Sequence, residues 1–380
     1  MKNIFKIPFA LTVLSVALVG CSSNSKTEKP KPVSLPKIQA QQSLEQVFSA
    51  STASAPKYDS SHYQIDRFDD VFYTASADGD VEAYEGKKRL WKVRPTKELS
   101  TGVTVEQGIA VVGTRKGQLY ALDAKTGQNV WQQQLSGSIL SPSLIYKNRV
   151  VTVSNDGTVV AHDVTSGQVL WTFNLPHTSL SIRGYAEPTI IDERTIAISS
   201  ANAYVYALDI ITGVPRWQRR VAVSEGRGDL QRMVDIDGRP IVVSSKMVTV
   251  SYQGQVTVVD LTTQKVIWSE NASSLNSPAS DGQRVFVATA DGRLVSYDLY
   301  TGQKNWENDQ LLHRGLSNPV VLQGKVVVGD YAGVLHVMDP ITGELIGRAK
   351  TSGDVRNLRV EDNLLYVSTT KGNFSVWQNH

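Results

Sequence analysis

Residues 117–131 read Gly117-Gln118-Leu119-Tyr120-Ala121-Leu122-Asp123-Ala124-Lys125-Thr126-Gly127-Gln128-Asn129-Val130-Trp131, and this stretch decides the fold because its pattern recurs along most of the chain. An Asp follows the first Gly by six residues, and a Trp follows that Asp by eight. The further copies are Gly157/Asp163/Trp171, Ala203/Asp209/Trp217, Gly254/Asp260/Trp268, Gly292/Asp298/Trp306 and Gly333/Asp339/Gly347, with degenerate copies at Gly79/Glu85/Trp91 and from Gly372 to Gln378. Eight copies, spaced 38 to 51 residues apart, indicate a repeat architecture.

Each copy contains the elements of four antiparallel strands. An apolar run such as 109–113 precedes the first Gly, which supplies the positive φ of a tight hairpin. A second strand then leads to Asp-x-x-Thr-Gly, a turn in which Asp caps the backbone. The Trp lies on the third strand, and a fourth fits before the next copy, often beginning near a proline such as Pro142. Four strands per ~40 residues predict an all-β fold, an eight-bladed β-propeller.

We interpret the repeated tryptophans as structural residues that dock each blade on its neighbour. A blade has two apolar faces and cannot be stable alone, and a buried indole covers a large area. The alternative is stacking on a cofactor, but six rings spread around a circle cannot face one ligand. The docking residues are Trp91, Trp131, Trp171, Trp217, Trp268 and Trp306.

The last copy stops before a Trp strand of its own, so the ring needs another segment to close. Residues 45–51 resemble the missing strand, with Phe48 in the place of Trp. We therefore expect the N-terminal strand to complete the final blade, which removes an open edge and ties the two ends of the chain together.

The first residues have the features of a targeting segment. Lys2 and Lys6 precede the apolar run 7–19, which is short for a membrane span, and Leu18-Val19-Gly20-Cys21 resembles a bacterial lipobox. This resemblance implies a signal peptide over 1–20 and a diacylglyceryl group with a further acyl chain such as palmitate on Cys21. Since residue 22 is Ser rather than Asp, the usual sorting pattern implies the outer membrane. The alternative is an ordinary signal peptide with an incidental cysteine.

We divide the remaining chain into a flexible acylated tether over 21–43 and a propeller over 44–380. The tether assignment follows from its Ser, Lys, Pro and Gln content, which cannot bury enough apolar surface to order itself. The chain has 39 basic and 36 acidic residues, which argues against binding nucleic acid by bulk charge. Its six histidines lack metal-ligand spacing, so we expect neither a metal nor a cofactor.

Two connections between blades are longer than the others, 176–185 and 224–238. Both follow a Trp strand, so they should emerge side by side on one face, where loops on a rigid scaffold often carry function. Their mixture of apolar and charged residues suits a protein interface with arginine anchors. The equally weighted alternative is ordinary variable loops, with the Asp residues making turns.

The motif Ala-x-Asp-x-x-Thr-Gly-x-x-x-Trp (121–131 and 207–217) resembles the quinoprotein-type propeller repeat. Together with the lipobox, the loops 179–184 and 235–237 and the stretch 311–314, the chain resembles the BamB family, β-propeller lipoproteins of the outer-membrane β-barrel assembly machinery. This resemblance implies a non-catalytic scaffold at the periplasmic face that binds the periplasmic repeat domains of the central barrel-inserting subunit. The residues implied in that contact are Leu180, Ile182, Arg183, Asp235 and Asp237, to which we add Asp229 and Arg232 from the same loop; His313 and Arg314 also match, in a role left open between binding and structure.

The sequence departs from the pattern at Gly347, at Thr263-Gln264 in place of Thr-Gly, and at Ile182, where the family more often has Leu. Two other classes of protein remain as alternatives. A quinone-dependent dehydrogenase of this fold would need a Ca²⁺ site. Such enzymes also resemble one another in having an adjacent Cys-Cys pair, which this chain lacks. For the second class, a polymer-binding propeller, the sequence contains no pattern that positively indicates such a ligand. Contact with unfolded outer-membrane proteins through a blade edge is a further hypothesis.

Overall fold

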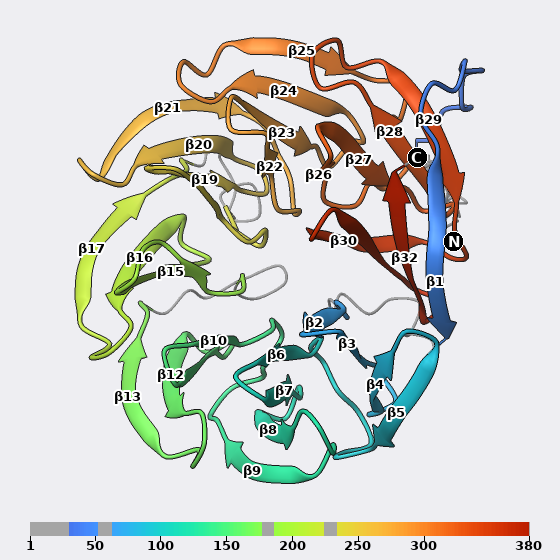
Figure 1. Ribbon diagram of the computed structural model, residues 1–380. Coiled ribbons are helices and arrows are strands. Elements are labelled where there is room, and N and C mark those ends of the chain that lie inside the picture. Colours follow the sequence, from blue (N-terminus) through green and yellow to red (C-terminus); the bar gives the residue numbers. More distant parts are fainter. Residues whose placement is uncertain (1–29, 52–62, 177–185, 224–233, 380) are drawn as a thin grey trace, which may run out of the picture. The chain divides into compact units, whose positions relative to one another are not determined.

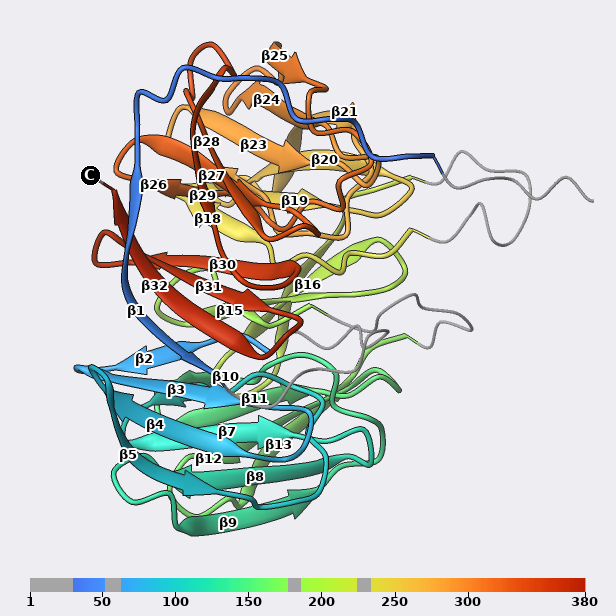
Figure 2. The same ribbon diagram turned by 90° about the vertical axis from the view of Figure 1, so that its right-hand side faces the viewer.

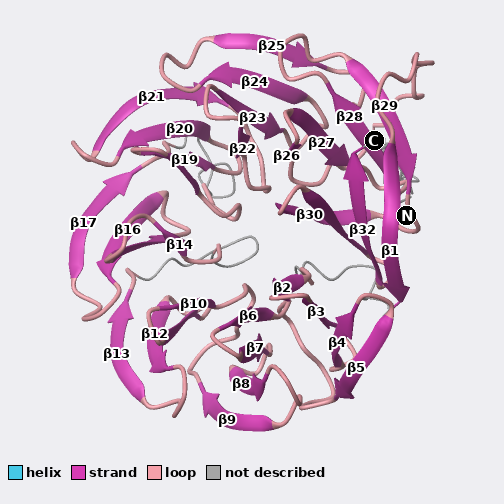
Figure 3. Cartoon of the chain, viewed as in Figure 1, coloured by secondary structure: helices cyan, strands magenta, loops and turns pink. Residues whose placement is uncertain are grey.

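The computed structural model describes residues 30–51, 63–176, 186–223 and 234–379. Within the unit Pro32–His380, the described strands form eight four-stranded antiparallel sheets arranged as a ring (Figure 1), which confirms the predicted eight-bladed propeller. The described residues contain strands, turns and loops but no helix (Figure 3), so none of them forms a helix that could span a membrane.

In each blade the strands follow one another from the centre of the ring to its rim. Blade 1 contains β2 (Asp66–Phe68), β3 (Val71–Ala75), β4 (Val81–Glu85) and β5 (Lys88–Val93); blade 2, β6 (Thr104–Glu106), β7 (Ile109–Gly113), β8 (Gln118–Asp123) and β9 (Asn129–Gln134); blade 3, β10 (Leu144–Tyr146), β11 (Arg149–Val153), β12 (Thr158–Asp163) and β13 (Val169–Asn174); blade 4, β14 (Thr189–Ile190), β15 (Thr195–Ser199), β16 (Tyr204–Asp209) and β17 (Pro215–Arg220). Blade 5 contains β18 (Ile241–Val243), β19 (Lys246–Val250), β20 (Gln255–Asp260) and β21 (Lys265–Asn271); blade 6, β22 (Ala279–Ser280), β23 (Arg284–Ala288), β24 (Leu294–Asp298) and β25 (Lys304–Asn308); blade 7, β26 (Val320–Leu322), β27 (Lys325–Gly329), β28 (Val334–Met338) and β29 (Leu345–Lys350); blade 8, β30 (Val355–Glu361), β31 (Leu364–Thr369), β32 (Asn373–Asn379) and β1 (Leu44–Ser51).

The turns of the repeat form as their residues require. Gly117, in the hairpin between the second and third strands of blade 2, has φ 78°, and Ala203 holds the same left-handed conformation in blade 4 with φ 65°. In the next turn the Asp123 carboxylate accepts hydrogen bonds of 2.7 Å from both the backbone N–H and the hydroxyl of Thr126. Gly127 completes that turn with φ 73°. Each motif residue therefore has a local, backbone-determined role.

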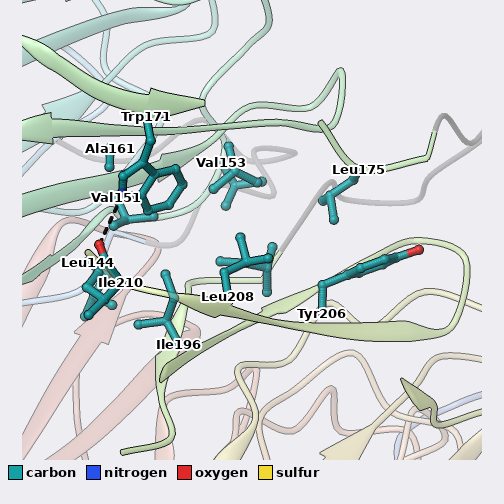
Figure 4. Close-up of a cluster of buried hydrophobic side chains, with 12 residues drawn as sticks. Leu144, Val151, Val153, Ala161, Trp171, Leu175, Ile196, Tyr206, Leu208 and Ile210 are labelled. Atoms are coloured by element: carbon teal, nitrogen blue, oxygen red, sulfur yellow. Dashed lines mark hydrogen bonds between the residues drawn. The ribbon is translucent and has the colours of Figure 1, made fainter. Parts of the chain in front are cut away.

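The core consists of apolar layers between neighbouring blades, and the tryptophans lie in these layers. Figure 4 shows the layer between blades 3 and 4, where the Trp171 indole donates a hydrogen bond of 3.0 Å to the carbonyl oxygen of Ile210. The same bond, at 2.9 Å, joins Trp91, Trp131, Trp268 and Trp306 to Ala124, Val164, Leu299 and Pro340 of the next blade. Trp217 packs in the layer between blades 4 and 5, where the next turn has Gln264, with φ 58°, in place of glycine.

The N-terminal strand closes the ring as expected. Strand β1 pairs with β32 at the rim of blade 8 (Figure 2), and Phe48 lies opposite Val376. A β-bulge falls immediately before Phe48, just as a bulge precedes Trp131 in blade 2. Phe48 therefore occupies the Trp position, and its ring stacks on Phe72 of blade 1 at a centroid distance of 5.8 Å.

Part of the segment that we assigned to the tether lies against the propeller. Residues 33–42 run along blade 7, where the backbone N–H groups of Gln41 and Gln42 donate hydrogen bonds to the carbonyl oxygen of Ile346. Gln42 also forms a parallel bridge with Gly347. In the described structure the propeller unit thus includes residues before position 44.

Candidate partner-binding face

The two long connections start on the same face of neighbouring blades. The Leu175 N–H donates to the Gly157 carbonyl oxygen at 2.9 Å, and the Val221 N–H donates to the Ala203 carbonyl oxygen at 2.8 Å. Each connection therefore begins beside the hairpin between the second and third strands of its blade, blade 3 for the first connection and blade 4 for the second. We call the face that carries these hairpins the loop face.

Most of the sequence-predicted contact residues lie outside the described residues. These are Leu180, Ile182 and Arg183 of the first connection and Asp229 and Arg232 of the second. Where the second connection begins, the described Val223 has 51% of its surface exposed. An apolar side chain this exposed at the base of a loop is compatible with a protein contact, although single exposed apolar residues are common on any surface.

The Asp-Ile-Asp segment is described, and its two carboxylates have different surroundings. Asp235 is 1% exposed, and its carbonyl oxygen accepts a hydrogen bond of 2.8 Å from the Tyr252 N–H. Ile236 is buried in the layer between blades 4 and 5 beside Met247. Asp237 is half-buried and lines the central cavity. The structure therefore anchors this segment through Asp235 and Ile236 and places Asp237 in the wall of the central cavity.

The central cavity has a volume of ≈ 550 Å³ and is lined by residues of the inner strands and of the connections that lead into them. Glu187 and Arg239, from blades 4 and 5, form an ion pair of 3.2 Å within it. Burial raises the pKa of Glu187, while the positive charges of Arg239 and Arg359 oppose that rise. The cavity wall therefore carries charged groups that already have partners within the protein.

Sequence reasoning did not identify Glu187 or Arg239, although a signal was present. Both directly precede a proline that leads into an inner strand, and the equivalent residues of other copies are the small polar Ser141, Ser277 and Asn318. Two neighbouring copies thus carry opposite charges where the repeat has a small polar residue. Glu187, Arg239, Ser277 and Asn318 all line the central cavity, so the copies differ in charge at positions on its wall.

His336 and Arg314 both interact with one buried carboxylate, that of Asp330. His336 is fully buried and lies 3.1 Å from Asp330, which also pairs with Arg314 at 2.7 Å. Burial opposes ionisation of Asp330, but hydrogen bonds from His336, the Val334 N–H and Arg314 outweigh it and lower the Asp330 pKa to about 2. Among the residues that the structure describes, no group of three His, Cys, Asp or Glu side chains could hold a metal ion.

Comparison with known proteins shows which proteins are similar to this chain in sequence and in structure. The family model described as outer membrane protein assembly factor BamB matches residues 77–308, more than half of the chain. A relative from Pseudomonas aeruginosa with that name is 33% identical over 349 residues, covering 91% of each chain. The crystal structure of BamB from Moraxella catarrhalis is similar with a TM-score of 0.83 and 36% identity, covering 88% of this chain and 100% of the other. A europium-containing methanol dehydrogenase, 14% identical with a TM-score of 0.70 over 88% of this chain and 93% of its own, shares the fold alone.

Proposed function

The chain belongs to the BamB family of outer membrane protein assembly factors, and on that basis we propose that it is a non-catalytic scaffold subunit of the outer-membrane assembly complex, aiding the folding and insertion of β-barrel proteins. The observation that carries this proposal is the match to this family across the propeller. A closed ring of eight blades with two long connections starting on one face is a rigid scaffold that can present loops to a partner. The named relatives are assembly factors rather than enzymes, and the quinone-dependent alternative is not favoured.

The partner that we propose is the set of periplasmic repeat domains of the barrel-inserting subunit. Contact residues would be Leu180, Ile182 and Arg183 from the first connection, with Asp229, Arg232 and Asp237 from the second. Arginine and apolar residues together are typical of the energetically important centre of an interface. Asp235 would act indirectly, because its burial and its bond to Tyr252 fix the start of the Asp-Ile-Asp segment.

A pull-down from mildly solubilised envelopes tests this assignment. The tagged wild-type chain should bring down the barrel-inserting subunit, and Arg183→Glu should lose it while the propeller stays folded. Lys125→Glu, an exposed charge reversal in the turn between β8 and β9, is the matched control and should retain the partner. Equal recovery with Arg183→Glu would place the contact elsewhere, and recovery of no assembly component from the wild type would refute the scaffold role.

We further propose that the protein is held at the periplasmic face of the outer membrane by acyl groups on Cys21 after removal of residues 1–20. The support is the lipobox-like sequence together with the outer-membrane function named for the relatives. Several acyl chains in one anchor would hold a protein stably on a bilayer. Cys21→Ala should fold normally and move to the soluble fraction, whereas recovery of this variant in the membrane pellet would contradict the anchor.

A second proposed contact is with unfolded outer-membrane proteins. Strand β13 is the free rim edge of blade 3 and contains no charged residue, and its Val169 and Leu170 are 51% and 42% exposed. An apolar free edge can pair with an extended peptide, and charged side chains usually protect such edges. Photo-cross-linkers at Leu170 should capture nascent barrel proteins, and a linker at Arg89 of β5 is the control. The absence of adducts at Leu170 would remove this contact.

A further inference from the structure

Residues 33–42, which we call the strap, are attached to blade 7 and to the connection that leads into it from blade 6. The Val33 N–H donates to the Leu312 carbonyl oxygen at 3.1 Å, and at the other end the Gln41 N–H donates to the Ile346 carbonyl oxygen at 2.7 Å. Between these points the Arg348 guanidinium donates to the Pro36 carbonyl oxygen at 2.7 Å. Leu35 and Ile38 pack on the apolar layer between blades 6 and 7, which contains Leu311, Leu316, Trp306 and Leu345.

The C-terminal end of the strap, at Gln42, lies against the position of the missing tryptophan. Gly347 lies opposite Val337 with a β-bulge next to it, the register that Trp131 has in blade 2. A Cβ atom on Gly347 would lie 2.4 Å from the Gln42 carbonyl oxygen, a distance that real Cβ atoms do not adopt. A side chain at position 347 therefore cannot coexist with Gln42 in its present place. The glycine of the seventh copy thus leaves room for the C-terminal end of the strap.

The buried ion pair of Arg314 and Asp330 holds the N-terminal end of the strap. Arg314 is 6% exposed and pairs with the buried Asp330, and one of its guanidinium nitrogens donates a hydrogen bond of 3.0 Å to the Val33 carbonyl oxygen. Charge-assisted hydrogen bonds are stronger than neutral ones, and a buried, paired arginine has little freedom to move. Val33 is therefore held at a fixed point of the propeller.

That fixed point lies on the loop face. Val33 is bonded to Leu312, and the next residue, His313, donates its N–H to the Asp291 carbonyl oxygen at 2.8 Å. Asp291 belongs to the hairpin between the second and third strands of blade 6, so this bond matches those that place Leu175 and Val221 beside their hairpins. The chain towards the N-terminus therefore leaves the propeller on the face where the two long connections start.

We propose that the strap sets the orientation of the propeller on the membrane, by fixing the exit of the lipid tether on the loop face. This inference rests on the proposed lipid anchor at Cys21. Eleven residues separate Cys21 from Val33, which makes twelve residue-to-residue steps, and an extended chain spans at most about 3.5 Å per step, so the exit point stays within about 40 Å of the bilayer surface. The loop face is the membrane-proximal face, and the opposite turns point away. A released strap would add ten residues to the tether and remove this bias.

The first test is whether strap binding depends on Gly347. In Gly347→Trp the blade receives the residue that six other copies have, so the propeller should fold while the strap detaches. Hydrogen exchange of the acylated protein in vesicles should show protected amides at Val33, Gln41 and Gln42 in the wild type, and a loss of protection of about tenfold or more in the variant. Arg348→Ala, a gentler change, should lose part of the protection, and Lys350→Ala on the same strand should retain it.

The second test measures which face lies nearer the bilayer. Lys116→Cys and Lys125→Cys place a fluorescent donor at opposite ends of β8, on the loop face and on the opposite face, with an acceptor in lipid vesicles of outer-membrane phospholipids. Energy transfer from position 116 should exceed that from position 125, and Gly347→Trp should abolish the difference. Equal transfer from the two positions in the wild type, or an unchanged difference in Gly347→Trp, overturns the orienting role. Failure of the wild type to bind vesicles removes the anchor itself, and the exchange data then still report separately whether the strap is bound.

Discussion

Trp171 and Gly213 form the contact on which one blade is set against the next. A Cβ atom on Gly213 would lie 2.6 Å from Cδ2 of Trp171, so the indole of blade 3 rests directly on the turn of blade 4. The same relationship joins Trp91 to Gly127 and Trp131 to Gly167. The Trp of one copy thus packs on the Thr-Gly turn of the next copy, and the two motifs form one interface between neighbouring blades.

Gly213→Ala should therefore destabilise the propeller more than the same change at Gly324. The two glycines have φ 72° and 73°, but an added Cβ at Gly324 meets nothing within 4 Å. Both variants bear the backbone cost of about 1–2 kcal/mol. Only Gly213→Ala adds overpacking against Trp171, a further cost of about 1–3 kcal/mol. The free energy of unfolding in urea measures the difference, and equal losses would show that the contact has no energetic weight.

Phe48→Ala should open the ring. Phe48 is buried against Phe72 and Phe374, and truncating a buried phenylalanine costs about 3–5 kcal/mol. Val47, the neighbouring bulge residue, is 38% exposed, and Val47→Ala should change stability by no more than about 0.5 kcal/mol. Thermal unfolding of the two variants checks this. A wild-type melting temperature for Phe48→Ala would mean that closure does not depend on this strand.

Removing one partner of the cavity ion pair should cost more than removing both. Arg239→Ala leaves the Glu187 carboxylate in a buried site without its ion-pair partner, a loss of about 1–3 kcal/mol. The double variant Arg239→Ala with Glu187→Gln removes the buried charge and should recover most of that loss. Denaturation of the two single variants and the double variant forms a thermodynamic cycle. Additive losses would show that the two side chains do not interact.

Acid should weaken the protein partly through His162. Burial lowers the pKa of His162 from 6.5 to about 4, so between these values the unfolded chain binds a proton that the folded chain does not. The stabilisation is present above pH 6.5 and is lost as the pH falls towards 4, by at most about 3 kcal/mol. His162→Phe, which keeps an aromatic ring beside Trp131, should show a shallower loss of stability over this range. Parallel pH profiles of the two proteins would exclude this role.

The sequence predicted the parts of the fold that each copy encodes locally. Gly117, Asp123 and Gly127 specify turns through their own backbone preferences, and the spacing of Trp131 follows from the strands between those turns. Closure by the strand that contains Phe48 was also predictable, because the last copy lacks a strand of this pattern. The interface of Trp171 with Gly213 was predictable only as blade docking, since the two motifs meet across neighbouring copies.

The candidate site was predictable to a lesser degree. The positions of the two long connections follow from the repeat, but the burial of Asp235 depends on the strands that pack around it. Glu187 and Arg239 approach each other because the ring brings every inner strand to one centre. No local pattern encodes that distance.

By itself, the sequence determined the eight blades, their docking residues and the strand that closes the ring. The reason is that each copy of the repeat contains the residues that specify its own turns and strands. Only the tertiary structure decided that residues 33–42 belong to the propeller. Their composition is that of a tether, and the residues that they contact, Gly347, Ile346 and Arg348, are about 300 residues away. Ring closure brings these distant segments together, and backbone hydrogen bonds hold the strap whatever its own propensity.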